Sequence, residues 1–337
     1  MLSALLSFLK ILYEEIISFF GIDSLISMVK SGDYSSLRTL DGILSVSGSL
    51  IPVLLIIEII RAFFFKKFMV EDYRVSFITI VFNRFVSRFI SIAAVAFCIG
   101  LFEKHALFKT QFTWYWLIYG YVIWEFAHFI YHYLAHKVRL LWCLHSTHHA
   151  PQAMNLSVTY AHFFLEAPYA DVIRTSICIL AGVNPPLLFF IMFIDGTWGA
   201  FIHVGESLLK NGRLGFLNRI ILTPSHHRVH HARNALYMDT NFCNLLNIWD
   251  KAFGTFQHEQ EEVPIEYGIT RKIKPNHFLD AYFGEIPSLW KDVKNAPGIR
   301  NKLGYLFMPP GWSHDGQHKT AKRLRDEYLK KERVGDG

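Results

Sequence analysis

The feature that most constrains this chain is three groups of histidines at helical spacing. Within each group the imidazoles recur three or four residues apart, which on a helix places them on one face, about a turn apart. Several ligands to one metal ion need such a spacing. The groups are His132 and His136; His145, His148 and His149; and His227, His230 and His231.

A single histidine on an apolar face is most often a core residue with one satisfied hydrogen bond. Here, however, eleven of the 17 histidines fall within the one hundred residues 132–231, because His162, His203 and His226 lie between or beside the three groups. Burying a neutral imidazole without a partner costs about 1–3 kcal/mol. Packing so many together without a metal would be strongly destabilising, and we therefore expect them to converge on metal ions.

The composition indicates a membrane protein. The chain is 52% hydrophobic and 16% aromatic, which is typical of membrane proteins rather than of soluble enzymes. Its net charge of +6 fits a polar face lying against anionic lipid. Nucleic acid would also explain basic charge, but no basic stripe with interleaved aromatic residues stands apart from the apolar segments. We therefore expect no nucleic-acid partner.

The four cysteines have no CxxC pattern and no spacing typical of disulfides. We expect buried, reduced thiols, and hence an active face exposed to the cytosol. The sequence shows no basic region before the first apolar residues and no small-residue cleavage site after them, so we predict no cleaved signal peptide.

Three apolar segments predict membrane-spanning helices. Residues 43–65 contain about the ~20 apolar residues that a span needs. Residues 76–102 form a second such segment, and residues 112–131 a third that ends just before His132. Lysines and arginines lie between the first two segments and after the third. By the positive-inside rule these ends, and the histidines with them, face the cytosol.

Residues 168–200 are also apolar but are interrupted by Asn184, Pro185 and Pro186. Proline halts a helix and disfavours the helical conformation in the residue before it. We predict two short helices that enter the membrane and return, which brings His203 back to the face of the other histidines.

The ends of the chain are more polar. Residues 2–20 predict an amphipathic helix suited to lying in the membrane interface, followed by a polar linker over 21–42. Residues 319–333 predict a charged surface helix.

The predicted fold is all-α: an integral membrane helical bundle of about three spans plus a membrane hairpin, with a cytosolic, histidine-rich helical cap. We expect three regions in the chain. They are an N-terminal interfacial helix and linker (1–42), a membrane catalytic domain (43–260) and a cytosolic C-terminal tail region (261–337).

The number of histidines argues for two metal ions. Imidazole suits zinc, copper, iron and nickel, so the ligand type alone leaves the metal open. A single catalytic zinc uses three protein ligands and a water, fewer than are offered here, and no HExxH motif is present. Eight or more nitrogens fit two ions with four or five ligands each. Such a pair is suited to dioxygen, with two irons sharing the electrons that cleave the O–O bond.

The order HxxxH, HxxHH, HxxHH resembles the fatty acid hydroxylase and sterol desaturase superfamily of membrane di-iron oxygenases. The stretches EFAHFIYHYLAHKVRLLWCLHSTHHAPQAMNLS and LTPSHHRVHHARNALYMDTNFCNLLNIWDKAFGTF look most like its alkylglycerol monooxygenase branch. The resemblance covers about residues 75–260. It implies that the eight histidines of the three groups bind the metals, that His203 joins them, and that His226 is a ligand or a donor behind one.

Carboxylates behind the ligands would orient the imidazole N–H groups. In the superfamily the position of Glu125 is often aspartate, and the WDKAFGT context of Asp250 matches the family. The candidates for this role are Glu125, Asp195, Asp239 and Asp250.

The resemblance implies an O2-dependent enzyme that hydroxylates, or desaturates, a C–H bond of a lipid with two iron ions as cofactors. No haem, flavin or nicotinamide motif is evident, so the electrons would come from a reduced pterin or an electron-donor protein. The site would face the cytosol, at the endoplasmic reticulum in a eukaryote or the inner membrane in a bacterium. Two alternatives stay open: a sterol or carotenoid desaturase or hydroxylase of the same superfamily, and a non-catalytic zinc-binding membrane protein.

Overall fold

The computed structural model describes residues 10, 13–14, 17–18, 22–35, 39, 49–65, 69–274 and 277–335. Over these residues the chain is helical and has no strand, because the only β-type pairings are two isolated bridges, Ile221 with Leu246 and Ala232 with Tyr267. The prediction of an all-α fold is confirmed. The chain divides into two compact units, Met1–Phe68 and Met69–Gly337.

The first unit contains α2 (Asp23–Ser31) and α4 (Leu50–Phe64). Helix α2 ends at Gly32, whose φ of 66° is the left-handed conformation that glycine favours at a helix end. It lies where a polar linker was predicted, so the structure differs there. Helix α4 has 15 residues, fewer than the ~20 of a membrane span. Most of the interfacial helix predicted over 2–20, and residues 43–48 of the first predicted span, lie outside the described residues.

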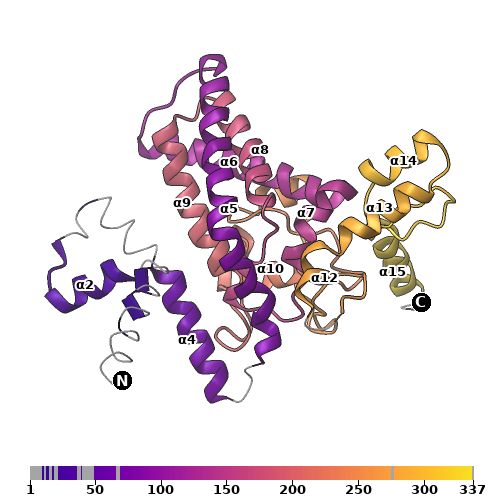
Figure 1. Ribbon diagram of the computed structural model, residues 1–337, viewed down its shortest axis with the longest axis horizontal. Coiled ribbons are helices and arrows are strands. Elements are labelled where there is room, and N and C mark those ends of the chain that lie inside the picture. Colours follow the sequence, from indigo (N-terminus) through magenta and orange to yellow (C-terminus); the bar gives the residue numbers. More distant parts are fainter. Residues whose placement is uncertain are drawn as a thin grey trace. The chain divides into compact units, whose positions relative to one another are not determined.

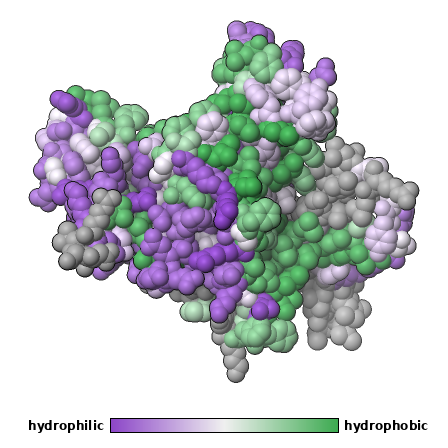
Figure 2. All heavy atoms as spheres, turned by 180° about the vertical axis from the view of Figure 1, so that it is seen from behind, coloured by the Kyte–Doolittle hydropathy of each residue, from purple (hydrophilic) through white to green (hydrophobic). Residues whose placement is uncertain are grey.

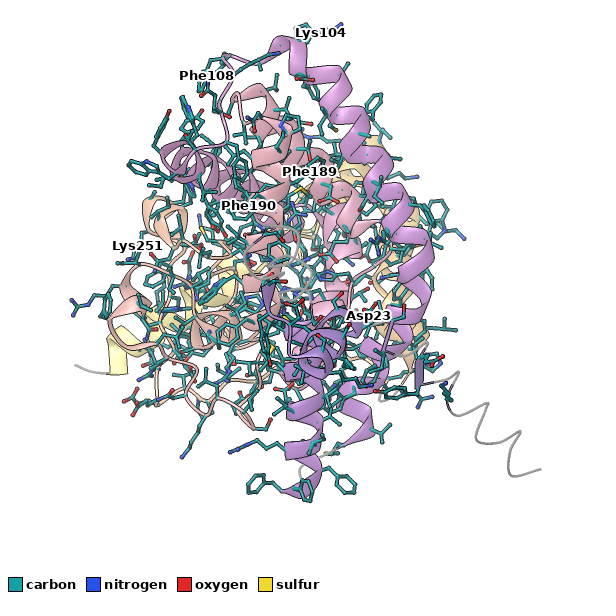
Figure 3. All side chains as sticks on the ribbon, turned by 90° about the vertical axis from the view of Figure 1, so that its left-hand side faces the viewer. Asp23, Lys104, Phe108, Phe189, Phe190 and Lys251 are labelled. Atoms are coloured by element: carbon teal, nitrogen blue, oxygen red, sulfur yellow. The ribbon has the colours of Figure 1, made fainter. Side chains whose placement is uncertain are left out.

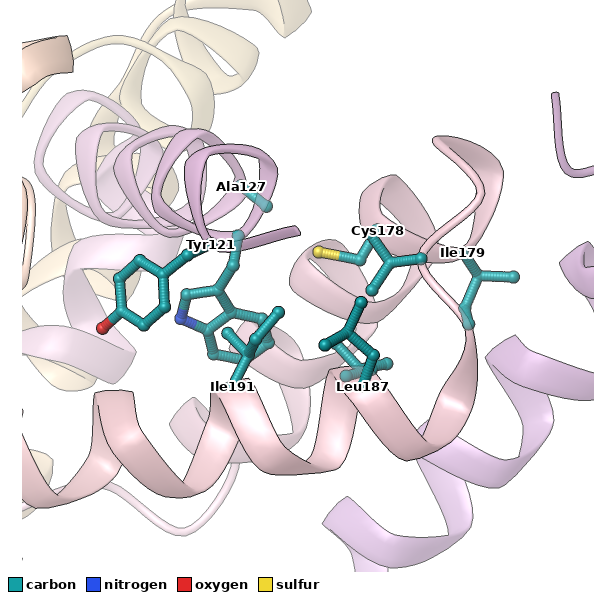
Figure 4. Packing of buried hydrophobic residues seen from close by; sticks show 9 residues of the cluster. Tyr121, Ala127, Cys178, Ile179, Leu187 and Ile191 are labelled. Atoms are coloured by element: carbon teal, nitrogen blue, oxygen red, sulfur yellow. The ribbon is translucent and has the colours of Figure 1, made fainter. Parts of the chain in front are cut away.

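The second unit is built on four long helices: α5 (Val70–Phe102), α6 (Trp114–Lys137), α8 (Glu166–Leu180) and α9 (Pro185–Phe201). Helix α8 packs against α5 and α6, and α6 also packs against α9 (Figure 1). The buried side chains between α6, α8 and α9 include Trp124, Cys178 and Leu187 (Figure 4). A Cβ at Gly120 would lie 2.8 Å from Ile191 Cδ1, so glycine allows α6 and α9 to approach closely.

The helical hairpin predicted over 168–200 is present as α8 and α9, and it breaks where the prolines indicate. The Asn184 side chain accepts a hydrogen bond from the Leu187 N–H (2.9 Å) and so caps α9. The Asn184 N–H donates to Thr110 Oγ1 (3.0 Å), which ties the turn to the loop between α5 and α6. Lys104 lies at the same end of the helical bundle as this turn, and Lys251 lies far from that end (Figure 3). The opposite ends of α6 and α9 lead to the histidines.

One helical stretch among the described residues, Val86–His105, is long and apolar enough to cross a membrane. It overlaps the second predicted span, residues 76–102, and is mostly exposed, with Phe89 and Phe97 among its exposed side chains. Hydrophobic residues run through the middle of the face seen in Figure 2. Helix α6 is long enough but does not meet the same hydropathy criterion, and α9 is shorter than a span. The described part of the chain thus contains one candidate span, whereas about three and a hairpin were predicted for the whole chain.

Shorter elements complete the second unit and cover the ends of α6 and α9. Helices α12 (Phe278–Phe283), α13 (Glu285–Asn295) and α14 (Gly298–Phe307) pack against α7 (Arg139–His149), and α15 (Ala321–Gly335) forms where a charged helix was predicted. All four cysteines are free and buried, as predicted. These elements are η2 (Glu103–His105), α7 (Arg139–His149), η3 (Leu156–Tyr160), η4 (Gly215–Arg219), α10 (Pro224–His230), α11 (Ile248–Phe253), α12 (Phe278–Phe283), α13 (Glu285–Asn295), α14 (Gly298–Phe307) and α15 (Ala321–Gly335).

Candidate metal centre

Nine of the ten predicted histidines meet in two buried clusters. In each cluster, one ring nitrogen from every member lies within 4.8 Å of those of the others. We call them the first and the second cluster. The first consists of His132, His136, His145, His149 and His230, and the second of His148, His203, His227 and His231.

The helical spacing explains how the two HxxHH groups are shared between the clusters. At 3.6 residues per turn, positions i and i+4 nearly superpose, whereas position i+3 points about 100° away from i+4. On α7 the i, i+4 pair His145 and His149 therefore enters the first cluster, and His148 enters the second. In the group on α10 the assignment is reversed, because His227 and His231 enter the second cluster and His230 the first. Both clusters thus draw on the same helices, which makes them neighbours.

Within each cluster the ring nitrogens are spaced like adjacent ligands of one ion. In the first, His145 Nε2 lies 3.0 Å from His132 Nε2 and 3.1 Å from His149 Nε2. In the second, His203 Nε2 lies 3.2 Å from His148 Nε2 and 2.9 Å from His227 Nε2. Two nitrogens about 2.1 Å from one metal, at a right angle, would be about 3.0 Å apart. The rings thus converge as ligands do.

Burial keeps these imidazoles neutral. Desolvation lowers the pKa of His136 to about 4 and that of His203 to about 3. It also lowers the pKa of His148 well below its usual value, and the neighbouring imidazoles add to the effect. The neutral ring has the free lone pair that binds a metal. Among the described side chains, His136 Nε2 and His230 Nε2 are buried with no hydrogen-bond partner, as expected of nitrogens that face a cation.

Backbone carbonyls fix the tautomer of three ligands, one or more in each cluster. A carbonyl oxygen only accepts, so the Nδ1 that contacts it carries the proton and Nε2 keeps its lone pair for a metal. The pairs are His132 with Phe242 (2.8 Å), His230 with Thr240 (2.8 Å) and His203 with Gly199 (2.6 Å).

Glu166 is a residue of the site that the sequence analysis missed. Its Oε1 accepts a hydrogen bond from His145 Nδ1 (2.5 Å), and its Oε2 lies 2.9 Å from His162 Nδ1. Burial alone would raise its pKa, but His162 and His145 lower the pKa of Glu166 to about 2. The His162 ring stacks on His148 of the second cluster at 4.3 Å. The i, i+4 spacing of His162 and Glu166 was the available signal.

Two of the four predicted carboxylates lie beside imidazoles. Asp239 Oδ1 is 3.4 Å from Nδ1 of His136, a member of the first cluster. Asp195 Oδ2 is 3.7 Å from His128 Nδ1, and the His128 ring packs edge-on against His132 at 5.6 Å. Asp195 thus reaches the first cluster through His128 rather than directly.

The other two carboxylates hold a loop instead of a ring. Asp250 accepts the backbone N–H groups of Phe242 and Cys243, each at 2.8 Å. Glu125 accepts the next N–H groups, those of residues 244–246. This loop carries the Phe242 carbonyl to His132, so both act on the ligand through the backbone. That differs from the direct role predicted for them.

His226 lies outside both clusters, although it was included in the predicted metal set. Its Nδ1 accepts from the Thr223 N–H (3.2 Å), and this pair forms a capping box at the start of α10. Its Nε2 lies 3.0 Å from His258 Nδ1. Both ring nitrogens are therefore engaged away from the metal centre.

A cavity of about 370 Å³ reaches the first cluster, where His136, His149 and His230 line it. Trp142 forms part of its wall. Residues from the end of the chain form another part, among them Ser288. The first cluster is thus accessible to a small molecule or to part of a larger one.

Comparison with known proteins agrees with this site. Residues 116–255 match the family model for fatty acid hydroxylases. The human alkylglycerol monooxygenase is 31% identical over 252 residues, which are 73% of this chain and 53% of the relative. That of Xenopus tropicalis is 31% identical over 269 residues, 77% of this chain and 57% of the relative. An ornithine lipid hydroxylase of Rhizobium tropici is 29% identical over 157 residues, 47% of this chain and 46% of the relative.

The chain spans about half the length of these curated relatives. No solved structure matches it. The resemblance inferred from the histidine spacing is confirmed, and residues 116–255, which hold all nine clustered histidines, are a domain of the fatty acid hydroxylase family.

Proposed function

We propose that this protein is a membrane-bound, O2-dependent lipid hydroxylase with two iron ions. The observation that carries the proposal is the pair of adjacent all-histidine clusters inside a fatty acid hydroxylase domain. The rings of His149 and His231, one from each cluster, stack with their centroids 4.4 Å apart. Two ions held by these clusters would be close enough to act together.

The donor set fits iron. Imidazole nitrogens bind iron well, and the five and four ligands of the two clusters leave positions open for an exogenous molecule. When bound, the two irons would supply the activation of O2 needed to hydroxylate an unactivated C–H bond. The chain contributes the rest: carbonyls and carboxylates set each ring, and burial keeps the ligands neutral and bulk water away.

The names of the relatives support a lipid substrate and hydroxylation. They are an alkylglycerol monooxygenase and an ornithine lipid hydroxylase. In an ether lipid, hydroxylation beside the ether oxygen would give a hemiacetal that separates into an aldehyde and an alcohol. We propose that the electrons come from a reduced pterin or an electron-transfer protein.

We further propose that the site lies on the cytosolic side of its membrane, the endoplasmic reticulum or a bacterial inner membrane. The candidate span Val86–His105 supports membrane insertion. Lys137 and Arg139, which follow the first histidine group, support a cytosolic position by the positive-inside rule.

The test is anaerobic loading of the full chain with ferrous iron, followed by metal analysis and O2 uptake with a panel of ether lipids, sterols and acyl lipids. We expect two irons per chain and lipid product that carries oxygen from 18O2. His145→Ala should abolish turnover by removing a ligand from the first cluster, and His203→Ala by removing one from the second. A protein that holds only zinc, with no turnover after iron loading, would instead be the non-catalytic alternative.

A further inference from the structure

Helices α13 and α14 expose an apolar surface that lies outside the family domain. On each helix the exposed apolar side chains recur at i, i+3 or i+4, and so share one side. All are at least a third exposed, and Trp290 and Ile299 are about 70% exposed. We call this set the apolar surface. It consists of Ile286 and Trp290 on α13 and of Ile299, Leu303 and Phe307 on α14.

The two helices are nevertheless anchored to the domain. Leu289 and Ala296 are buried, and the Arg139 N–H at the start of α7 donates to the Met308 carbonyl (3.1 Å). One side of the two helices therefore packs against the domain, and the apolar surface lies on their exposed side. A contiguous exposed apolar patch beside charged residues marks an interaction site more often than chance exposure. Hydrophobic residues at the upper left of Figure 2 mark the α14 part of it.

The charges around the apolar surface are positive. Lys291, Lys294 and Arg300 are exposed. The acidic side chains of these helices turn the other way, because Glu285 pairs with Arg271 (2.7 Å) and Asp292 with Arg139 (3.4 Å). Exposed apolar groups flanked by lysine and arginine are the features with which a helix lies on an anionic lipid surface. A second copy would bring the same positive charges together, which opposes a symmetric dimer here.

The inner side of the same helices leads to the metal centre. Glu285 and Ser288 of α13, and Pro309 and Pro310 just after α14, line the cavity that reaches the first cluster. The element that carries the apolar surface is thus also a wall of that cavity. A lipid held at the apolar surface would thus contact an element that also lines the cavity.

We propose that the apolar surface of α13 and α14 docks on an anionic lipid leaflet and so places the cavity against the lipid headgroups. This goes beyond the proposed function, because it concerns how the protein meets lipid and would hold whatever reaction the cavity serves. Aromatic and aliphatic side chains would enter the headgroup region, and the three basic side chains would contact lipid phosphates or carboxylates.

The experiment uses one labelled cysteine in the full chain. All four native cysteines are buried, so a fluorophore on Leu303→Cys would report on α14 alone. The matched control is Glu262→Cys, at an exposed position of the same unit. Each protein is placed in nanodiscs of brominated phosphatidylcholine, with and without one third phosphatidylglycerol, and quenching by bromine is measured. Lys291→Glu with Arg300→Glu provides the charge-reversed background.

We expect several-fold stronger quenching at position 303 than at 262. It should be strongest with phosphatidylglycerol and weakened by salt or by the charge reversal. Equal quenching at both positions would overturn the proposal. So would quenching at 303 that ignores lipid charge, salt and the charge reversal, or a concentration-dependent loss of lipid contact at 303, which would show that a second copy covers this surface.

Discussion

Replacing Glu166 with glutamine should weaken metal binding in the first cluster. The carboxylate faces two imidazoles, with Oε1 2.5 Å from His145 Nδ1 and Oε2 2.9 Å from His162 Nδ1. Glutamine keeps the shape but offers one acceptor oxygen and one NH2 donor. It therefore cannot present an anionic oxygen to both rings, and an amide N–H turned toward His145 would repel the Nδ1 proton that leaves Nε2 free for the metal.

The size of the effect follows from the role of the contact. Removing the partner behind a metal-binding histidine typically lowers metal affinity or activity 10–100-fold, which is about 1.4–2.7 kcal/mol. Only His145 is a ligand held by Glu166, so the first cluster should lose affinity and the second should keep most of its own. When metal is limiting, we expect the metal content of the Glu166→Gln variant to fall from two ions per chain toward one. Titration of the metal-free protein, and metal analysis after dialysis, would measure this change.

The matched control is Glu266→Gln, because Glu266 is an exposed carboxylate whose partner Arg233 is 3.3 Å away. Such a surface pair contributes about 0–1 kcal/mol to stability, and this variant should bind two ions like the parent. If Glu166→Gln also bound both ions with parental affinity, Glu166 would not position His145. If it lost both ions equally, with a large fall in unfolding temperature, the change would be one of folding rather than of ligand orientation.

Three further predictions concern the metal set, its pH dependence and the cavity. His226→Ala should keep two ions per chain but lose about 1 kcal/mol of stability, because it removes the ring that accepts the Thr223 N–H in the capping box of α10. Metal analysis and thermal unfolding would show both effects, and loss of an ion would place His226 among the ligands. Desolvation lowers the pKa of His136 to about 4 and of His203 to about 3, while both titrate near 6.5 when unfolded. The metal-free protein should thus become less stable as the pH falls below 6.5, because the unfolded chain takes up protons first. Denaturant unfolding at pH 7 and at pH 5 tests this prediction, and equal stability at the two values would contradict it. Thr270→Trp, at an exposed position on the cavity wall, should lower turnover at least tenfold with metal content unchanged, and unaltered turnover would show that substrate takes another route.

The histidine spacing predicted which residues would meet but not how they would be divided. Positions i, i+3 and i+4 share a face of an isolated helix, which predicts one site for each group. Where helices cross, the 100° between i+3 and i+4 is enough to send His148 to the second cluster and His149 to the first. That division depends on how α6, α7 and α10 approach one another, which the spacing within a single helix does not encode.

Hydropathy predicted the long helices, but only one helical stretch of the described residues, Val86–His105, is long and apolar enough to cross a membrane. It scores apolar content alike whether a side chain faces lipid or another helix, and much of α6 is buried against α8 and α9. The last residues show a similar limit. They were predicted as a tail because they are polar on average, yet Tyr282 is buried and its hydroxyl donates to Asn83 Oδ1 (2.8 Å) on α5. A few buried side chains such as Tyr282 anchor the C-terminal helices to the rest of the unit, and the average composition of this region does not show which side chains these are.

Asp250 and Glu125 bind the backbone N–H groups of the loop over residues 242–246, whereas the motif comparison predicted that they would contact imidazole N–H groups. Asp250 accepts the first two N–H groups of this loop, and Glu125 accepts the next three. Every backbone donor of the five residues is thus bound to a buried carboxylate, which positions an irregular segment without helical hydrogen bonds. Its Phe242 carbonyl then lies 2.8 Å from His132 Nδ1. Glu125 influences the metal site through the backbone of residues at least 119 positions later in the chain, and a pattern that pairs side chains with ligands cannot represent such a contact.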